Sequence, residues 1–322
     1  MVRYLARLGT MAWGMRNRHA RSSNEMTLQG YVEGGFWLVP GWMYEVDVRL
    51  FVVMNESQRD LEIRGDLLDI GAYKGRASIL LGYLRGDTEA LTVCDLFGAR
   101  ASNAYSAREN AEYYPGFSVE GFQENYLRFH PELPTVVEGQ SAGLAELCAP
   151  RTFRFIHVDG SHMYPDVRGD LVISKTLAVP SGSVVAIDDI CSPHTPGVWA
   201  AAWETIFADQ LVPLVVTGSK LYCSWGEGAD ELSARLVERL EADPRLVTET
   251  HPIRDRQLVR VSLVPEAKRK GRDRITRWLP PVAIDLAGKM RKRALGYSRS
   301  WRPIGDRGDV PPNLEPHSPR RE

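Results

Sequence analysis

Long apolar runs are absent from this sequence, and cysteine is scarce. Nowhere do about 18 apolar residues follow one another without interruption, which excludes a membrane-spanning helix. The 4 cysteines are far apart and form no CxxC pair, which argues against a zinc site or a disulfide framework and fits reduced thiols in a cytosol. The first residues include Arg3 and Arg7 and no small-residue cleavage site, so we expect a cytoplasmic protein without a signal peptide.

A strong net charge is also absent. The 40 basic and 41 acidic residues give a net charge of −1, which argues against a nucleic-acid-binding protein. Residues 266–322, however, contain 15 Lys or Arg and 7 Asp or Glu, a net charge of +8 that leaves −9 on residues 1–265. We expect this proline-containing tail to be partly disordered. Its residues 275–295 mix apolar and basic side chains, which suits contact with a membrane surface or a solvated tail equally well.

Short apolar runs alternate with amphipathic segments along most of the chain. Alternation of this kind predicts βαβ units and a mostly parallel, doubly wound sheet with helices on both faces, in a Rossmann-like α/β fold. We expect this domain to occupy residues 30–265, with an N-terminal extension at 1–29 and the tail at 266–322. The expected strands are 66–70, 90–94, 135–137, 153–158, 183–187, 212–216 and 258–263, and the expected helices include 76–84, 142–148, 165–177, 198–209 and 231–240.

The segment before the first expected strand is rich in aromatic residues. Trp37, Trp42 and Tyr44 lie within it. They could form a lid that stacks on a ligand, or bury a helix against the sheet. The sequence leaves both alternatives open.

The first motif with chemical content is LLDIGAYKGRAS, residues 67–78. A strand ends in Asp69, and a loop bounded by Gly71 and Gly75 opens a helix, where free backbone amides face a ligand. The spacing is GxxxG and lacks the middle glycine of a dinucleotide fingerprint, so an NAD-dependent oxidoreductase is disfavoured. An acid at this loop suits a ligand with an ammonium group, although a tight turn would also use glycine.

Two further strand ends carry polar residues. Asp95 ends the next strand, 26 residues after Asp69, where an acid can hold the hydroxyls of a ribose. Ser141 follows the third strand and could reach the edge of a base. Each could instead be an ordinary turn residue. Together they predict a cofactor that contains a nucleoside.

The fourth and fifth strands end in a group of carboxylates. Asp159 follows one of them, and Asp188 and Asp189 follow the other. The carboxyl ends of adjacent parallel strands open on one edge, where three carboxylates would repel one another without a positive charge between them. A hard divalent cation, Mg²⁺ before Ca²⁺, would supply that charge. The alternative is that the acids cap turns or bind backbone amides.

Taken together, LLDIGAYKGRAS, LTVCDLFG, FIHVDGSHMYPDVRGDL and VPSGSVVAIDDI with PGVWAAAW resemble class I S-adenosylmethionine-dependent methyltransferases. The likeness is to the small-molecule branch of the macrocin and sugar O-methyltransferase type, over about residues 30–225. It implies a seven-stranded Rossmann-like fold that binds S-adenosylmethionine, and often Mg²⁺. The residues that the resemblance places at the cofactor are Asp69, Gly71, Tyr73, Gly75, Ser78, Asp95, Ser141 and Asp159, and those at the metal are Asp159, Asp188 and Asp189.

Methyl transfer to an aliphatic hydroxyl needs a base to remove the proton and gains from a metal that lowers the pKa of the hydroxyl. His162, three residues after Asp159, is the first candidate for the base, and His194 is the second. His157 alternates with buried strand positions and is interpreted as structural. We expect a hydroxyl acceptor in a sugar-containing or polyketide-like small molecule, and relatives of this kind include homodimers. The alternatives are a catechol or other small acceptor, or a non-catalytic binding module of the same fold.

Overall fold

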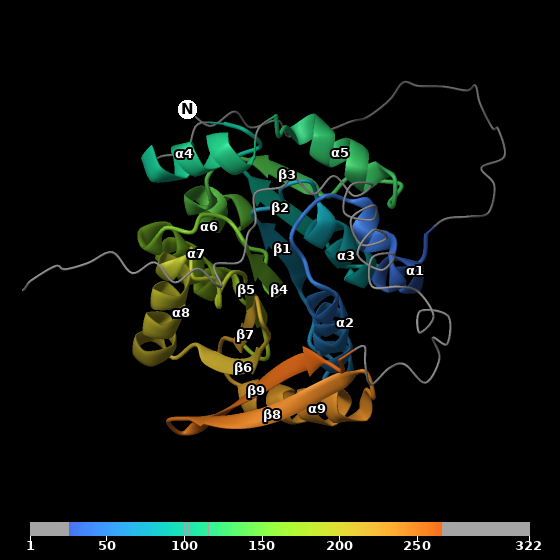
Figure 1. Ribbon diagram of the computed structural model, residues 1–322, viewed down its shortest axis with the longest axis vertical. Helices are drawn as coiled ribbons and strands as arrows, with labels where there is room; N and C mark the ends of the chain where they lie inside the picture. Colours follow the sequence, from blue (N-terminus) through green and yellow to red (C-terminus); the bar gives the residue numbers. More distant parts are fainter. Residues whose placement is uncertain (1–25, 100, 102–103, 115, 266–322) are drawn as a thin grey trace, which may run out of the picture. The chain divides into compact units, whose positions relative to one another are not determined.

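The computed structural model describes residues 26–99, 101, 104–114 and 116–265. Most of the expected N-terminal extension and the whole tail from residue 266 therefore lie outside the described residues. The described part is built around one sheet with the strand order β3-β2-β1-β4-β5-β7-β6-β9-β8 (Figure 1). The strands are β1 Asp66–Ile70, β2 Leu91–Asp95, β3 Thr135–Glu138, β4 Phe153–Val158, β5 Val184–Ile187, β6 Val212–Val216, β7 Leu221–Ser224, β8 Leu246–Ile253 and β9 Arg256–Leu263.

The first five strands are parallel to one another, as the sequence predicts. β7 runs antiparallel between β5 and β6, while β9 is parallel to β6 and pairs with β8 as a hairpin. The Rossmann-like α/β fold is confirmed, but the sheet has nine strands instead of the expected seven. The hairpin adds to the edge because Leu246, Val259 and Val261 bury apolar side chains in the same core as β6.

Helices cover both faces of the sheet, as a parallel sheet requires (Figure 1). One core contains buried residues of α1, α2, α3 and α9, and the other contains residues of α6, α7 and α8. The helices are α1 Leu28–Glu33, α2 Glu45–Asp60, α3 Arg76–Leu84, α4 Ala104–Tyr113, α5 Val119–Leu127, α6 Leu144–Cys148, α7 Tyr164–Leu177, α8 Pro196–Asp209 and α9 Ala229–Ala242, with 3-10 turns η1 Gly35–Leu38 and η2 Ser141–Gly143.

The strand order reverses between β1 and β4, which is the position where doubly wound sheets bind ligands. Ile70 of β1 pairs with Val158 of β4, and Val158 pairs with Ile187 of β5. The three strands therefore end level with one another. This register places the residues that follow each strand on one edge of the sheet.

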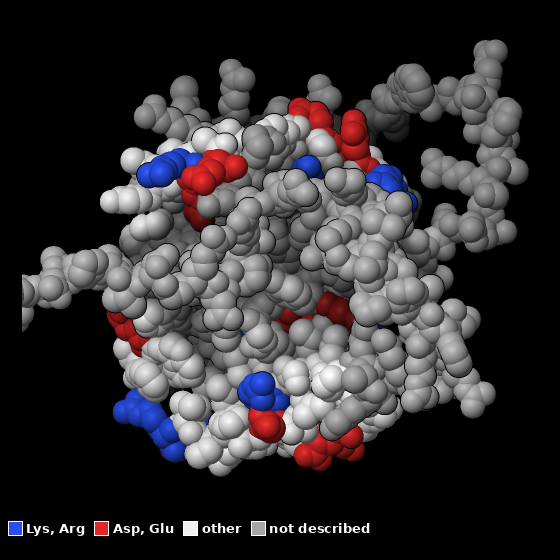
Figure 2. All heavy atoms as spheres, viewed as in Figure 1, with Lys and Arg blue, Asp and Glu red and all other residues white. Residues whose placement is uncertain are grey.

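On the face seen in Figure 2, the coloured acidic and basic side chains occur in small groups, several of which contain both signs of charge. Within the described ranges, no helix has the length and apolar character needed to cross a membrane.

Candidate functional site

The loop after β1 passes directly over the end of β4. Gly71 and Gly75 have φ angles of +87° and +92°, and Tyr73 between them has a φ of +46°. A Cβ on Gly71 would lie 1.9 Å from the carbonyl oxygen of Asp159, so only glycine fits there without a shift of the backbone. Gly75 immediately precedes α3, and the free amides of the first helical turn therefore belong to this edge of the sheet.

Asp95, at the end of β2, joins the two loops at this edge. Its carboxylate accepts the backbone N–H of Tyr73 at 2.9 Å and that of Phe97 at 2.8 Å. Burial raises the pKa of Asp95 to about 6, although these two amides act in the opposite direction. The carboxylate thus orders the glycine loop while it remains partly exposed.

Asp69 and Ser78, both predicted to contact a cofactor, are fully buried and bind each other. Ser78 donates to one carboxylate oxygen of Asp69, and the other oxygen lies 2.8 Å from Nδ1 of His157. A ligand would have to break this pair to reach either residue. Their place in the structure is behind the loop, where they tie β1, β4 and α3 together.

Ser141 has a similar internal partner. Its hydroxyl donates to the carboxylate of Asp170 on α7. Burial raises the pKa of Asp170 to about 7, although the Ser141 hydrogen bond lowers it. Ser141 is partly exposed and follows β3, with Asp170 orienting its hydroxyl. Its contact with a base stays a prediction.

His162 lies between two carboxylates. Its Nδ1 is 2.5 Å from Glu109 of α4, and its Nε2 is 2.8 Å from Asp189. Burial lowers the pKa of His162, but hydrogen bonds and charge from Asp189 and Glu109 outweigh it and raise the pKa to about 10. In this arrangement the imidazole carries a proton at neutral pH.

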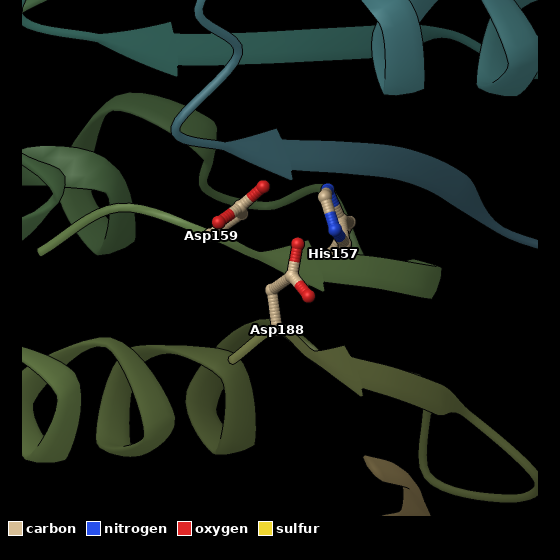
Figure 3. Close-up of side chains that lie close together, drawn as sticks. All are labelled: His157, Asp159 and Asp188. Atoms are coloured by element: carbon tan, nitrogen blue, oxygen red, sulfur yellow. The ribbon is translucent and has the colours of Figure 1, made fainter. Parts of the chain in front are cut away.

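Asp188 lies deeper than Asp189 and has a buried cation beside it. Lys220 forms an ion pair with Asp188, and its Nζ is also 2.9 Å from Nε2 of His157. Burial opposes ionisation of Asp188, but the charge of Lys220 holds its pKa below the ordinary value. Burial and the negative charge of Asp188 raise the pKa of Asp159. Figure 3 shows the side chain of Asp188 directed from the end of β5 toward Asp159 and His157.

Among the described residues, two sets of side chains have ligand atoms within 4.8 Å of one another. The first contains His157, Asp159 and Asp188, and the second contains Asp159, His162 and Asp189. The predicted trio of aspartates is thus divided between two sets that share Asp159. A small pocket lies at the same place, where the walls include Asp159, His162 and Asp188 beside apolar side chains of β4, β5, α7 and α8.

An aromatic cluster lies over the glycine loop. Tyr73 stacks on Trp42 with ring centroids 5.3 Å apart, and Tyr114 meets both rings edge-on. Burial and the charges of Asp159, Glu109 and Asp189 raise the pKa of Tyr114, which places this residue close to the acids. Trp42 is 53% exposed. We call Trp42, Tyr73 and Tyr114 the aromatic rim.

The aromatic N-terminal segment is divided between the core and the surface. Trp37 packs against Phe36, which is buried, and the guanidinium of Arg76 lies 5.2 Å from the Trp37 ring. Trp42 and Tyr44 are more than half exposed. The first part of the segment is therefore core, and the second part faces outward near the site.

His194, the second candidate for a base, is exposed and belongs to neither set of clustered ligands. Sequence reasoning did not find Glu109, Tyr114 or Lys220. Glu109 and Tyr114 come from a segment in which no helix was expected, and Lys220 precedes a strand that was not expected. The available signal for Lys220 was its position between two short apolar runs, the first of which ends at residue 216 and the second of which begins at residue 221.

Residues 68–190 match the family described as "Methyltransferase domain", in agreement with the predicted resemblance to methyltransferases. Comparison with curated proteins gave no match. Similar solved structures include the O-methyltransferase NovP, with 21% identity, a TM-score of 0.44 and coverage of 56% of this chain and 80% of that one. CalS11, a TDP-rhamnose 3'-O-methyltransferase of calicheamicin biosynthesis, has 19% identity, a TM-score of 0.39 and coverage of 55% and 78%. TomG from Streptomyces achromogenes has 14% identity, a TM-score of 0.33 and coverage of 70% and 81%.

Proposed function

We propose that this protein transfers a methyl group from S-adenosylmethionine to a hydroxyl, with the help of Mg²⁺. The match of residues 68–190 to a methyltransferase domain supports this proposal. The acceptor that we propose is a sugar-containing or polyketide-like small molecule. The observation that carries this proposal is one shared edge, where the glycine loop and Asp95 lie beside Asp159, His162 and Asp189.

The residues at this edge fit a nucleoside cofactor with an activated methyl group. Gly71 lets the loop pass against the backbone of Asp159, where any Cβ would clash, and Asp95 is a partly exposed carboxylate suited to ribose hydroxyls. Asp69 and Ser78 support the loop from behind. Transfer from a sulfonium needs little bond chemistry from the protein, so proximity and orientation are the main contributions of these residues.

The carboxylates of Asp159 and Asp189 fit a hard divalent cation, which prefers oxygen ligands. When bound, such a cation lowers the pKa of a hydroxyl that it coordinates. These two carboxylates supply the negative charge that the cation needs. A cation bound to Asp189 would also weaken the attraction between the Asp189 carboxylate and the imidazole of His162.

In this proposal His162 takes the proton of the acceptor hydroxyl. Glu109 orients the ring through Nδ1, and Nε2 faces the acid cluster through Asp189. The imidazole is protonated while both carboxylates act on it. His162 can therefore act as a base only when Asp189 no longer holds the proton on Nε2. A cation bound to the Asp189 carboxylate would bring about this change.

The aromatic rim is the proposed wall for the acceptor. An aromatic face offers apolar area to the faces of sugar and polyketide rings at little entropic cost, because aromatic side chains are rigid. Trp42 is exposed and Tyr114 lies close to the acids. A ring held on this wall would present its hydroxyl to the acid cluster.

Isothermal titration calorimetry with S-adenosylmethionine and with NAD, each with and without Mg²⁺, tests the proposal. We expect micromolar binding of S-adenosylmethionine, no binding of NAD, and binding at least tenfold weaker in Asp95→Asn, because a carboxylate that holds ribose and loop is lost. Asp87→Asn, an exposed acid in the turn before β2, is the matched control. Absence of S-adenosylmethionine binding to the wild type would contradict the proposal.

A further inference from the structure

Lys220 is a buried cation placed directly beside the acid cluster. It ends the turn between β6 and β7, where its backbone N–H donates to Oγ1 of Thr217 at 2.9 Å. Ile187 at the end of β5 pairs with Leu221 at the start of β7. Since these strands are antiparallel, the residue before Leu221 lies next to the residue after Ile187. The sheet register itself therefore sets Lys220 against Asp188.

The ammonium group of Lys220 is buried between two side chains. It donates to Oδ2 of Asp188 and to Nε2 of His157, and its side chain is 1% exposed. Since Nε2 of His157 accepts, Nδ1 carries the hydrogen that is donated to Asp69. A continuous chain of hydrogen bonds thus runs from Asp188 through Lys220 and His157 to Asp69, behind the glycine loop.

The carboxylate of Asp188 is engaged by this chain, by the backbone and, through a side-chain hydrogen bond, by Asp159. Its Oδ1 accepts the backbone N–H of Asp189 at 2.8 Å, and its Oδ2 accepts from Lys220. The Asp188 side chain is 7% exposed, whereas that of Asp189 is 35% exposed. The two neighbouring aspartates therefore face different surroundings, one a buried ammonium group and the other the accessible edge.

A divalent cation on Asp188 would meet a like charge. Magnesium sits about 2.1 Å from its oxygen ligands, and an ammonium group on the same carboxylate would be only a few ångströms away in a buried place where charges are weakly screened. We propose that Lys220 is the built-in counter-cation of Asp188, and that Asp188 is a positioning residue, so that the divalent cation is confined to Asp159 and Asp189. This inference rests on the proposed function and divides the predicted aspartate trio by role.

Binding of Mn²⁺ alone, followed by electron paramagnetic resonance, tests the assignment in the full-length chain. We expect the double variant Asp188→Asn/Lys220→Gln, which removes the ion pair without leaving a buried charge, to change the Mn²⁺ dissociation constant by less than about threefold. Asp189→Asn should weaken Mn²⁺ binding at least tenfold, because only Asp189 is a ligand. Asp87→Asn is the control for a general loss of negative charge. Equal weakening in the double variant Asp188→Asn/Lys220→Gln and in Asp189→Asn would overturn the proposal.

A second set of variants tests the pairing of Lys220 with Asp188 if the wild type binds no Mn²⁺. Lys220→Gln removes the ammonium charge, and it should then gain an Mn²⁺ site that disappears in the double variant with Asp188→Asn, while Lys220→Arg gains none. Failure of Lys220→Gln to gain the site would overturn the proposal. Circular dichroism confirms that each variant is folded. S-Adenosylmethionine binding by the same samples separates this inference from the proposed function. A wild type that does not bind S-adenosylmethionine contradicts the proposed function, while the Mn²⁺ result still decides the role of Asp188.

Discussion

His162 is the residue whose loss should affect chemistry most and binding least. Its ring lies between Glu109 and Asp189 at the accessible edge. With an acceptor that the wild type turns over, we expect His162→Gln to lower kcat by about 10²–10⁴-fold, the range for loss of a general base. The measurement is release of S-adenosylhomocysteine, with cofactor affinity from calorimetry expected to stay within about twofold.

The matched control for that experiment is His194→Gln, since His194 is exposed and outside the clustered ligands. Its kcat should stay within about twofold of the wild type, because no proton transfer is assigned to it. A large loss in His194→Gln with normal activity in His162→Gln would reverse the assignment of the base.

Gly71 allows a comparison between steric and conformational effects at positive φ. Gly71→Ala places a Cβ 1.9 Å from the Asp159 carbonyl oxygen, whereas Gly116, with a φ of +71°, has nothing within 4 Å of its Cβ position. Chemical denaturation should show that Gly116→Ala costs about 1 kcal/mol, from backbone strain alone. Gly71→Ala should cost at least about 3 kcal/mol and abolish cofactor binding. Equal costs would mean that the loop moves away freely.

Asp170 should make stability fall as the pH rises. Burial raises its pKa in the folded protein to about 7, while the unfolded carboxyl titrates near 4. Folding therefore binds the proton, and this stabilising contribution is lost between about pH 4 and pH 7. In urea denaturation at pH 4.5 and 7.5, Asp170→Asn should reduce the fall in unfolding free energy by about 3 kcal/mol. Parallel curves for wild type and variant would refute the raised pKa.

At the residue scale, the sequence identifies acids but not their partners. Asp95, Asp159 and Asp189 follow strands whose ends meet at one edge, and this follows from local pattern and sheet topology. Glu109 meets His162 across 53 residues of chain, and such contacts depend on the packing of a helix that the local pattern did not show. The same holds for Asp69, where the acid was visible and its burial against His157 was not.

Among the elements, the segment from Gly35 to Tyr44 is tied to α3 by the side chain of Arg76. The guanidinium of Arg76 donates to the carbonyl oxygen of Val39 through Nε at 2.8 Å and Nη2 at 2.5 Å, and it lies over the Trp37 ring. Lysine keeps the charge but cannot make this forked contact or stack in the same way. We expect Arg76→Lys to loosen the segment that carries Trp42.

Hydrogen exchange measures that loosening directly. Amides of residues 36–43 should exchange at least tenfold faster in Arg76→Lys, which corresponds to about 1.4 kcal/mol of lost local stability, while β1 and β4 stay unchanged. Arg59→Lys is the control, since Arg59 also donates to a carbonyl oxygen, that of Leu84. Unchanged exchange in residues 36–43 would show that the apolar contacts alone hold the segment.

The predicted strand bounds agree best with the structure where helices cover both faces of a strand. The bounds 66–70, 153–158 and 212–216 agree with β1, β4 and β6 residue for residue, because buried strands have continuous apolar sequences. β7 has only four residues, and most side chains of β8 are exposed. Strands of these kinds pair because of their neighbours, so the local sequence carries a weak signal for them.

At the scale of the whole molecule, chemistry and charge are separated along the chain. Residues 26–265 contain both hydrophobic cores and every residue assigned to the site. The basic tail after Pro265, with its net charge of +8, lies outside the described residues. Because every residue assigned to the site lies within 26–265, cofactor binding should not need the tail. Contact with a membrane surface, one of the two alternatives for the tail, should need the tail alone.

Cosedimentation with lipid vesicles separates these two properties. The full chain should pellet with vesicles that contain about 30 mol % anionic lipid and remain in solution with neutral vesicles, because each Lys or Arg near an anionic surface contributes about 1 kcal/mol. About 0.5 M salt should release it through screening. A chain that ends at Pro265 should stay in solution with both kinds of vesicle and still bind S-adenosylmethionine within about twofold of the full chain. If the shortened chain pellets as well, the surface of the methyltransferase domain and not the tail makes the contact, and if the full chain stays in solution, the tail has no affinity for an anionic bilayer.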